Sequence, residues 1–198
     1  MDIVVFGGTG MIGSRIAAEL EQRGHTVMIA TRSTHHEVTD PASVAEVAAG
    51  ADAVVSAVSA RGTDYTLVDI ATALTEGARR AQTERVLVVG GAGSLEVAPG
   101  VRLVDTPEFP DEWKPEALEQ ADTLEFLRGL EDLDWTYVSP AAVIHPGERT
   151  GRYRLGGDLL LVDEETGASE ISAEDYAVAV ADVLEHATHR RARVSVAW

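Results

Sequence analysis

The sequence predicts an α/β fold, a doubly wound parallel sheet with flanking helices. Short apolar runs alternate along the chain with segments whose apolar residues recur at helical spacing. The apolar runs are continuous, which is typical of strands that helices cover on both faces. At 198 residues the chain has the length of one such domain. We therefore expect a single domain over 1–198, with a substrate pocket built from loops.

The first thirty residues predict a strand, a glycine-rich turn, a helix and a second strand. The apolar run 3–6 leads directly into the turn, a helix follows over 14–23, and another strand covers 25–30. The turn glycines recur at every third position, as Gly7, Gly10 and Gly13. Because glycine has no side chain, a pyrophosphate can reach the unpaired N–H groups and the positive dipole end of the helix.

This pattern predicts a Rossmann-type βαβ unit that binds a dinucleotide. The alternative is a tight turn without a ligand, because turns use glycine for several reasons. A mononucleotide P-loop is excluded, since no Lys-Ser or Lys-Thr pair follows the glycines.

The remaining segments continue the alternation of strands and helices. Asp40 and Pro41 suit the N-cap and first turn of a short helix over 40–48. The residues from Ser172 to Asp175 cap the helix that runs to about His186. The other predicted strands are 52–58, 85–90, 135–139 and 192–197, and the other predicted helices are 65–80 and 115–130.

Two connections, 91–114 and 141–161, are much longer than the others, and both follow predicted strands. A doubly wound sheet binds its ligand beyond the carboxyl ends of its strands, and long loops in a compact domain are often functional. We expect them to form the two walls of the substrate pocket. Arg149, Arg152 and Arg154 either reach a ligand phosphate there or offset nearby acids.

Composition excludes several classes of partner. The net charge of −17 disfavours nucleic acid, because a phosphate backbone needs a basic surface. The sequence contains no cysteine, no leader and no apolar run long enough to cross a bilayer, so we expect a cytoplasmic protein without a membrane partner. His35 and His36 are adjacent and have no accompanying acid cluster, so we expect no metal site.

Five segments together resemble those of atypical short-chain dehydrogenase/reductases: 7–13 (GGTGMIG), 30–32 (ATR), 89–94 (VGGAGS), 137–141 (YVSPA) and 171–177 (ISAEDYA). More narrowly, the chain is similar to the small NAD(P)H-binding group that includes NmrA-like proteins and biliverdin reductase B or flavin reductase. The resemblance spans nearly the whole chain. It implies a Rossmann fold and a nicotinamide cofactor.

The chain departs from the superfamily in one motif. Typical members use Tyr-x-x-x-Lys to protonate the carbonyl that receives hydride. None of the tyrosines has a lysine four residues later: Tyr65, Tyr137, Tyr153 and Tyr176. This departure disfavours sugar epimerisation and ordinary alcohol oxidation, and it favours reduction of an electron-poor conjugated ring, which needs less acid catalysis.

Arg32 follows the second strand, about where the ribose of the adenosine half lies in this fold. No acid occupies that strand end, and an arginine suits a 2′-phosphate, so we expect a preference for NADP(H) over NAD(H). The alternative is a solvated charge. The other residues expected to contact the cofactor lie in the turn and at strand ends: Gly7, Thr9, Gly10, Met11, Ile12, Gly13, Ser56, Ala57, Val58, Gly90, Gly91, Ser139, Pro140 and Ala141.

Ser94 resembles the position of the family's active-site serine, so its hydroxyl is the candidate catalytic group that contacts the substrate. No histidine or lysine lies beside it in the sequence, so it is not expected to act as a nucleophile, and it would otherwise cap its loop.

The sequence therefore predicts an NAD(P)H-dependent oxidoreductase that transfers hydride to a small planar acceptor, such as a flavin or a quinone. Positioning would supply most of the rate effect, and protons would come from solvent. One alternative is a non-catalytic NADP(H)-binding sensor of the NmrA type. Another is an isomerase or lyase that retains its cofactor. The sequence indicates no oligomeric state.

Overall fold

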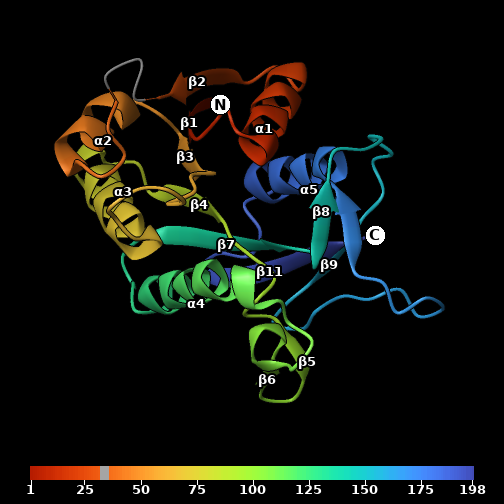
Figure 1. Cartoon of the computed structure of the whole chain (residues 1–198). Helices are drawn as coiled ribbons and strands as arrows, with labels where there is room; N and C mark the ends of the chain where they lie inside the picture. Colours follow the sequence, from red (N-terminus) through yellow and green to blue (C-terminus); the bar gives the residue numbers. More distant parts are fainter. Residues whose placement is uncertain (32–35) are drawn as a thin grey trace.

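The computed structural model describes residues 1–31 and 36–198, and these contain a seven-stranded sheet in the order β2-β1-β3-β4-β7-β11-β9 (Figure 1). All neighbouring strands are parallel except β9, which runs antiparallel to β11. The strands are β1 (Asp2–Phe6), β2 (Thr26–Ala30), β3 (Ala53–Ser56), β4 (Arg85–Val89), β7 (Asp134–Pro140), β9 (Arg154–Gly156) and β11 (Ala192–Ala197). The predicted α/β fold with a doubly wound, mostly parallel sheet is confirmed.

Helices cover both faces of this sheet (Figure 1). One face carries α1 (Met11–Gln22) and α5 (Ala173–Glu185), and the other carries α2 (Pro41–Ala48), α3 (Leu67–Ala81) and α4 (Lys114–Arg128). Strand β1 shows why the apolar runs are continuous. Ile3 and Val5 belong to the core under α1 and α5, whereas Val4 and Phe6 belong to the opposite core.

Side chains fix the starts of three helices. The Asp40 carboxylate accepts a hydrogen bond from the Ala42 N–H, and Ser172 accepts one from the Asp175 N–H, as the sequence indicates. At α3, Thr66 and Asp69 form a capping box. Helix α1 differs, because Gly10 occupies its N-cap and, within the described residues, no side chain caps it.

The long connections contain short elements that the sequence analysis missed. The first holds the hairpin of β5 (Glu96–Ala98) and β6 (Val101–Arg102), then two short 3₁₀ turns, Leu103–Asp105 and Asp111–Trp113. In the second, β8 (Val143–His145) pairs with β10 (Glu170–Ser172), and β9 joins the sheet edge. A strand of two or three residues is too short to show a hydrophobic period, which explains the omission.

Residues 147–151 of the second connection are held against α1 and α5. Arg149 donates two hydrogen bonds, of 2.7 and 2.8 Å, to the Glu19 carboxylate, which is 5% exposed and also accepts one from Arg23. Asp175 accepts hydrogen bonds from Thr150 Oγ1 and the Gly151 N–H. Arg149 therefore offsets a buried acid, which favours the second of its two predicted roles.

Among the helices of residues 1–31 and 36–198, none combines the length and the apolar character that crossing a bilayer requires.

We predict that Glu19→Gln destabilises the fold by about 2 kcal/mol at neutral pH, because it removes a buried charge from two arginines. The Arg149 guanidinium holds the pKa of Glu19 below its ordinary value. A carboxyl with a lowered folded-state pKa contributes stability above its unfolded pKa and loses it as the pH falls through the folded pKa. Urea unfolding should therefore show a difference from the wild type that shrinks at acidic pH.

Glu46→Gln, on the exposed side of α2, is the matched control and should change little at either pH. An effect of Glu19→Gln that is the same at neutral and acidic pH would contradict this account.

Candidate functional site

The carboxyl ends of β1, β3, β4 and β7 lie at one edge of the sheet, and strand order reverses between β1 and β3. The glycine turn lies at this reversal. Gly7 has φ +77°, and a Cβ there would lie 2.4 Å from the Ala57 carbonyl oxygen. A Cβ on Gly13 would lie 2.2 Å from the Gly7 carbonyl oxygen. Glycine at both positions lets the turn, the start of α1 and the end of β3 touch.

The first turn of α1 presents backbone donors at this edge. The Gly10 N–H bonds to the Gly7 carbonyl at 3.0 Å, and the first helical bond runs from the Ser14 N–H to the Gly10 carbonyl. The N–H groups of Met11, Ile12 and Gly13 lie between them, where a helix has no acceptors of its own. The first turn contains no acidic residue. This geometry suits an anion such as a pyrophosphate.

A first cavity, the turn cavity, has a volume of about 490 Å³. The turn lines it through Gly7, Thr9 and Gly10, and the end of β3 lines it through Ala57 and Val58. Ala30 and Thr31, at the end of β2, also line it. The cavity therefore lies where a Rossmann fold receives its dinucleotide.

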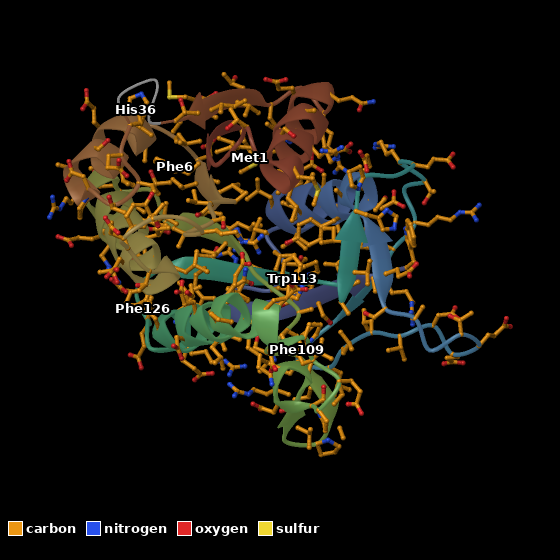
Figure 2. The ribbon with its side chains drawn as sticks, viewed as in Figure 1. Met1, Phe6, His36, Phe109, Trp113 and Phe126 are labelled. Carbon is orange, nitrogen blue, oxygen red and sulfur yellow. The ribbon has the colours of Figure 1, made fainter. Side chains whose placement is uncertain are left out.

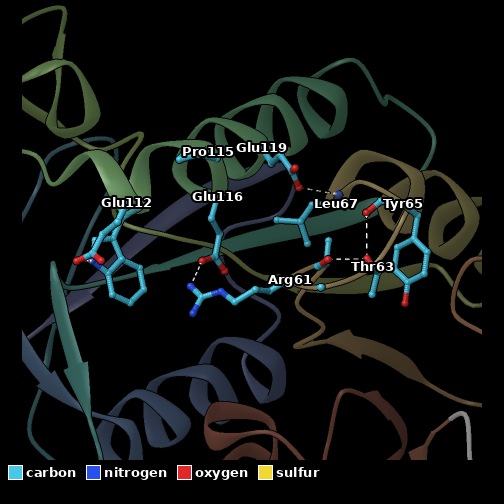
Figure 3. A pocket seen from close by; sticks show the side chains of 11 residues that line it. Arg61, Thr63, Tyr65, Leu67, Glu112, Pro115, Glu116 and Glu119 are labelled. Atoms are coloured by element: carbon cyan, nitrogen blue, oxygen red, sulfur yellow. Dashed lines mark hydrogen bonds and ion pairs between the residues drawn. The ribbon is translucent and has the colours of Figure 1, made fainter.

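A second cavity of about 510 Å³, the middle cavity, adjoins the first and shares Arg61, Thr63 and Tyr65 with it. It lies between the loop after β3 and the start of α4. Figure 3 shows Arg61 pointing across this space to the Glu116 carboxylate, with which it forms an ion pair. The Arg61 guanidinium carbon also lies 5.0 Å from the centre of the Trp113 ring.

A third cavity of about 400 Å³, the loop cavity, shares Trp113 and Glu116 with the middle cavity. Most of its lining is apolar. Figure 2 labels two of its aromatic residues, Trp113 directly before α4 and Phe109 in the segment between the β5–β6 hairpin and α4. Its lining residues are Gly91, Ala92, Gly93, Leu103, Phe109, Pro110, Trp113, Glu116, Ala117, Gln120, Ala142, Val143 and Ile144. The three cavities thus form one groove along the sheet edge.

The two long connections contribute unequally to this groove. The first supplies its glycine segment and its aromatic residues, as expected for a pocket wall. The second supplies only Ala142, Val143 and Ile144, because residues 147–151 pack on α1 and α5. The expected second wall is therefore limited to the start of the connection.

Only some of the predicted cofactor residues that the structure describes line one of the three cavities. Gly7, Thr9, Gly10, Ala57 and Val58 line the turn cavity, and Gly91 lines the loop cavity. Met11, Ile12 and Gly13 form the first turn of α1. The remaining described residues are buried and line none of the three cavities: Ser56, Gly90, Ser139, Pro140 and Ala141. Arg32 and His35 lie outside the described residues.

Gly90 and Gly91 lie so close to the side chains of Tyr137 and Gln120 that neither position has room for a Cβ. A Cβ on Gly90 would lie 2.1 Å from the Tyr137 ring, and one on Gly91 would lie 1.9 Å from Gln120 Oε1. Tyr137 donates a hydrogen bond to the Gln120 carbonyl at 2.9 Å and accepts one from the Gly91 N–H, and burial raises its pKa. Tyr137 therefore supports the cavity floor from below.

Ser94 is 7% exposed and lines none of the three cavities. Its hydroxyl accepts a 2.9 Å hydrogen bond from Arg193 Nη1, and the Arg193 Nε also bonds to Asp158 at 2.8 Å. Because the hydroxyl is buried and paired, the geometry does not support its predicted contact with substrate. It favours the alternative, in which Ser94 stabilises its loop.

The residues that sequence analysis missed lie in the middle and loop cavities, chiefly Arg61, Phe109, Trp113 and Glu116. Arg61 comes shortly after the predicted strand 52–58. Because ligands in this fold bind beyond the carboxyl ends of strands, its position could have identified it as a site residue. Across the described residues, no group of three or more histidine, aspartate and glutamate side chains could hold a metal ion.

Comparisons with known proteins agree with this geometry. A family model for NAD(P)H-binding matches residues 31–187. The uncharacterized protein YwnB of Bacillus subtilis (strain 168) is 39% identical over 99% of this chain and 98% of its own. A putative exported protein from Burkholderia pseudomallei is 49% identical, with a TM-score of 0.93 over 100% of both chains. Because this relative is named as exported, the cytoplasmic location of the present protein stays a prediction.

A third relative, a putative NADH-flavin reductase from Streptococcus pneumoniae, is 34% identical, with a TM-score of 0.85 over 100% of this chain and 99% of its own. The family model covers well over half of the chain, and these relatives share its whole length. The chain belongs to the NAD(P)H-binding family, among the atypical short-chain dehydrogenase/reductases.

Proposed function

We propose that this protein is an NAD(P)H-dependent oxidoreductase that transfers hydride to a small planar acceptor, such as a flavin or a quinone. The observation that supports the proposal is the groove itself. It begins at an uncapped helix N-terminus that suits a pyrophosphate and ends in an apolar, aromatic cavity that suits a conjugated ring. The name of the Streptococcus pneumoniae relative points to the same chemistry.

The residues present fit a dinucleotide. Any side chain at Gly7 or Gly13 would collide with backbone, so both glycines are needed for the turn to pack against α1 and the end of β3. We propose that the first-turn N–H groups hold the pyrophosphate and that the end of β2 holds the adenosine ribose. A preference for NADP(H) over NAD(H) rests on Arg32 in the sequence.

The acceptor would lie in the loop cavity. A bound nicotinamide cofactor supplies the hydride. The chain supplies position: Phe109 and Trp113 present aromatic surface to a flat ring, and Gly91 leaves room at the floor. Ser94 and Tyr137 are both buried and already paired, so we propose that protons come from solvent.

The same buried hydroxyls favour a second candidate, a non-catalytic NADP(H)-binding sensor of the NmrA type. Oxidation of NADPH, followed by its absorbance with riboflavin, naphthoquinones and aldehydes as acceptors, separates the two. We expect turnover with the planar acceptors and little with aldehydes. Tight NADPH binding without turnover of any acceptor would reject the enzyme and favour the sensor.

We predict that Gly10→Ala weakens NADPH binding at least about tenfold, or about 1.4 kcal/mol, because its methyl group would stand beside the first-turn donors. A Cβ there lies 3.3 Å from the Gly7 carbonyl oxygen, so the fold should tolerate it with a small shift. Titration calorimetry measures the affinity, and thermal unfolding checks the fold. Gly157→Ala meets no atom within 4 Å and is the control. Equal NADPH affinity in both variants would refute the assignment of the turn.

We predict that Arg32→Ala raises the dissociation constant of NADPH at least about tenfold and that of NADH less than about twofold, because only NADPH carries the 2′-phosphate. Arg80→Ala removes the same charge from the exposed side of α3 and is the control. Fluorescence titrations with both cofactors give the constants. If Arg32→Ala weakens the two cofactors equally, the argument for phosphate recognition fails.

A further inference from the structure

The loop cavity is almost free of charge. Of its thirteen lining residues, all within the described part of the chain, Glu116 is the only one with an ionisable side chain. The rest are glycine, alanine, aliphatic, aromatic and proline residues together with Gln120. Trp113 and Val143 are 47% and 48% exposed, so both stand at the mouth. Such a lining recognises a flat apolar ring by contact and offers no ammonium or guanidinium to an anionic substituent.

Residues 103–120, which include Trp113 at the mouth, are strongly acidic. They contain one lysine and six carboxylates, which are Asp105, Glu108, Asp111, Glu112, Glu116 and Glu119. Lys114 is paired with Asp111 at 2.7 Å, and Arg102 is paired with Asp105 at 2.7 Å. Among the ion pairs of the described residues, none involves Glu112 or Glu119.

Arg61 does not reverse this charge. It is the only arginine or lysine among the described residues that line the three cavities, and its guanidinium is paired with Glu116. That pair is about neutral; Arg61 lines the turn and middle cavities, and Glu116 lines the middle and loop cavities. The carboxylates of Glu112 and Glu119 line the adjoining middle cavity, so the charge beside the loop cavity is negative, and the net charge of −17 adds to it.

We infer that the loop cavity selects uncharged planar acceptors and discriminates against the same rings when they bear a phosphate or sulfonate. The inference rests on the proposed function and narrows its acceptor class. An anionic substituent that projects from the mouth meets carboxylates through water, where repulsion lowers both encounter and affinity. Salt screens such an interaction over about 10 Å at 0.1 M, so the discrimination must depend on ionic strength.

Riboflavin and FMN provide the direct comparison, because they share one ring system and differ by a phosphate. With NADPH as donor at low ionic strength, we expect kcat/KM for riboflavin to exceed that for FMN at least about tenfold. In about 1 M salt the ratio should fall to about two. Reduction of FMN as efficiently as riboflavin at low ionic strength would overturn the inference.

Glu116→Gln tests whether this mouth is responsible. The substitution releases Arg61 from its carboxylate and removes one negative charge, so the ratio of riboflavin to FMN efficiency should fall about fivefold. Glu76→Gln is the matched control, since Glu76 is also paired with an arginine, Arg80, but lies well along α3 from the cavities. The control should leave the ratio unchanged. Equal effects of the two variants would show that only net charge matters and would overturn the inference.

Binding separates this inference from the proposed function. The quenching of flavin fluorescence in the presence of NADP⁺ gives dissociation constants for riboflavin and FMN without turnover. If riboflavin binds at least about tenfold more tightly but neither flavin is reduced, the cavity selects as inferred and the enzyme proposal fails. If the two flavins bind equally, or neither binds, the inference fails whatever the activity.

Discussion

Three backbone segments meet at the carboxyl edge of the sheet with no room for a side chain between them. The carbonyl of Gly7 lies against Gly13, and the carbonyl of Ala57 lies against Gly7. This contact fixes the N-terminus of α1 over the point where strand order reverses. It also leaves the first-turn N–H groups without a side-chain cap, directly after Gly10, which lines the turn cavity. The groove, the cofactor assignment and the acceptor inference all depend on that placement.

The lining of the groove is more polar at the turn cavity than at the loop cavity. We therefore assign cofactor binding to the first and hydride transfer to the second. At the turn, backbone donors offer local positive potential within an acidic chain, so an anionic cofactor has one favourable place to bind. At the loop cavity the donors give way to aromatic and aliphatic surface. Between them, Arg61 and Glu116 form a neutral pair, and the carboxylates of Glu112 and Glu119 leave the middle of the groove negative. The inferred choice of acceptor follows from the same acidic surface.

Sequence reasoning succeeds where the signal is local. Each correctly predicted feature depends on residues that are close together in the sequence. These features are the alternation of strands and helices, the glycine spacing of the turn, and the caps at Asp40 and Ser172. Sequence reasoning fails where distant segments meet. Ser94 resembles a catalytic residue in its own loop, but its hydroxyl is bound to Arg193, 99 residues away. Gly90 is small because of Tyr137, and no local pattern predicts that contact. The strands in the long connections are too short for any periodicity.

The most direct test of the central claim observes the backbone donors themselves. In a ¹⁵N-labelled sample titrated with NADPH, the amide resonances of Met11, Ile12 and Gly13 should shift strongly, in step with those of Thr9 and Gly10. Amides at the far end of α1, near Gln22, should shift little. NADPH binding that leaves residues 9–13 unperturbed, or no binding at all, would contradict the account, because the glycine turn would then have no dinucleotide to receive.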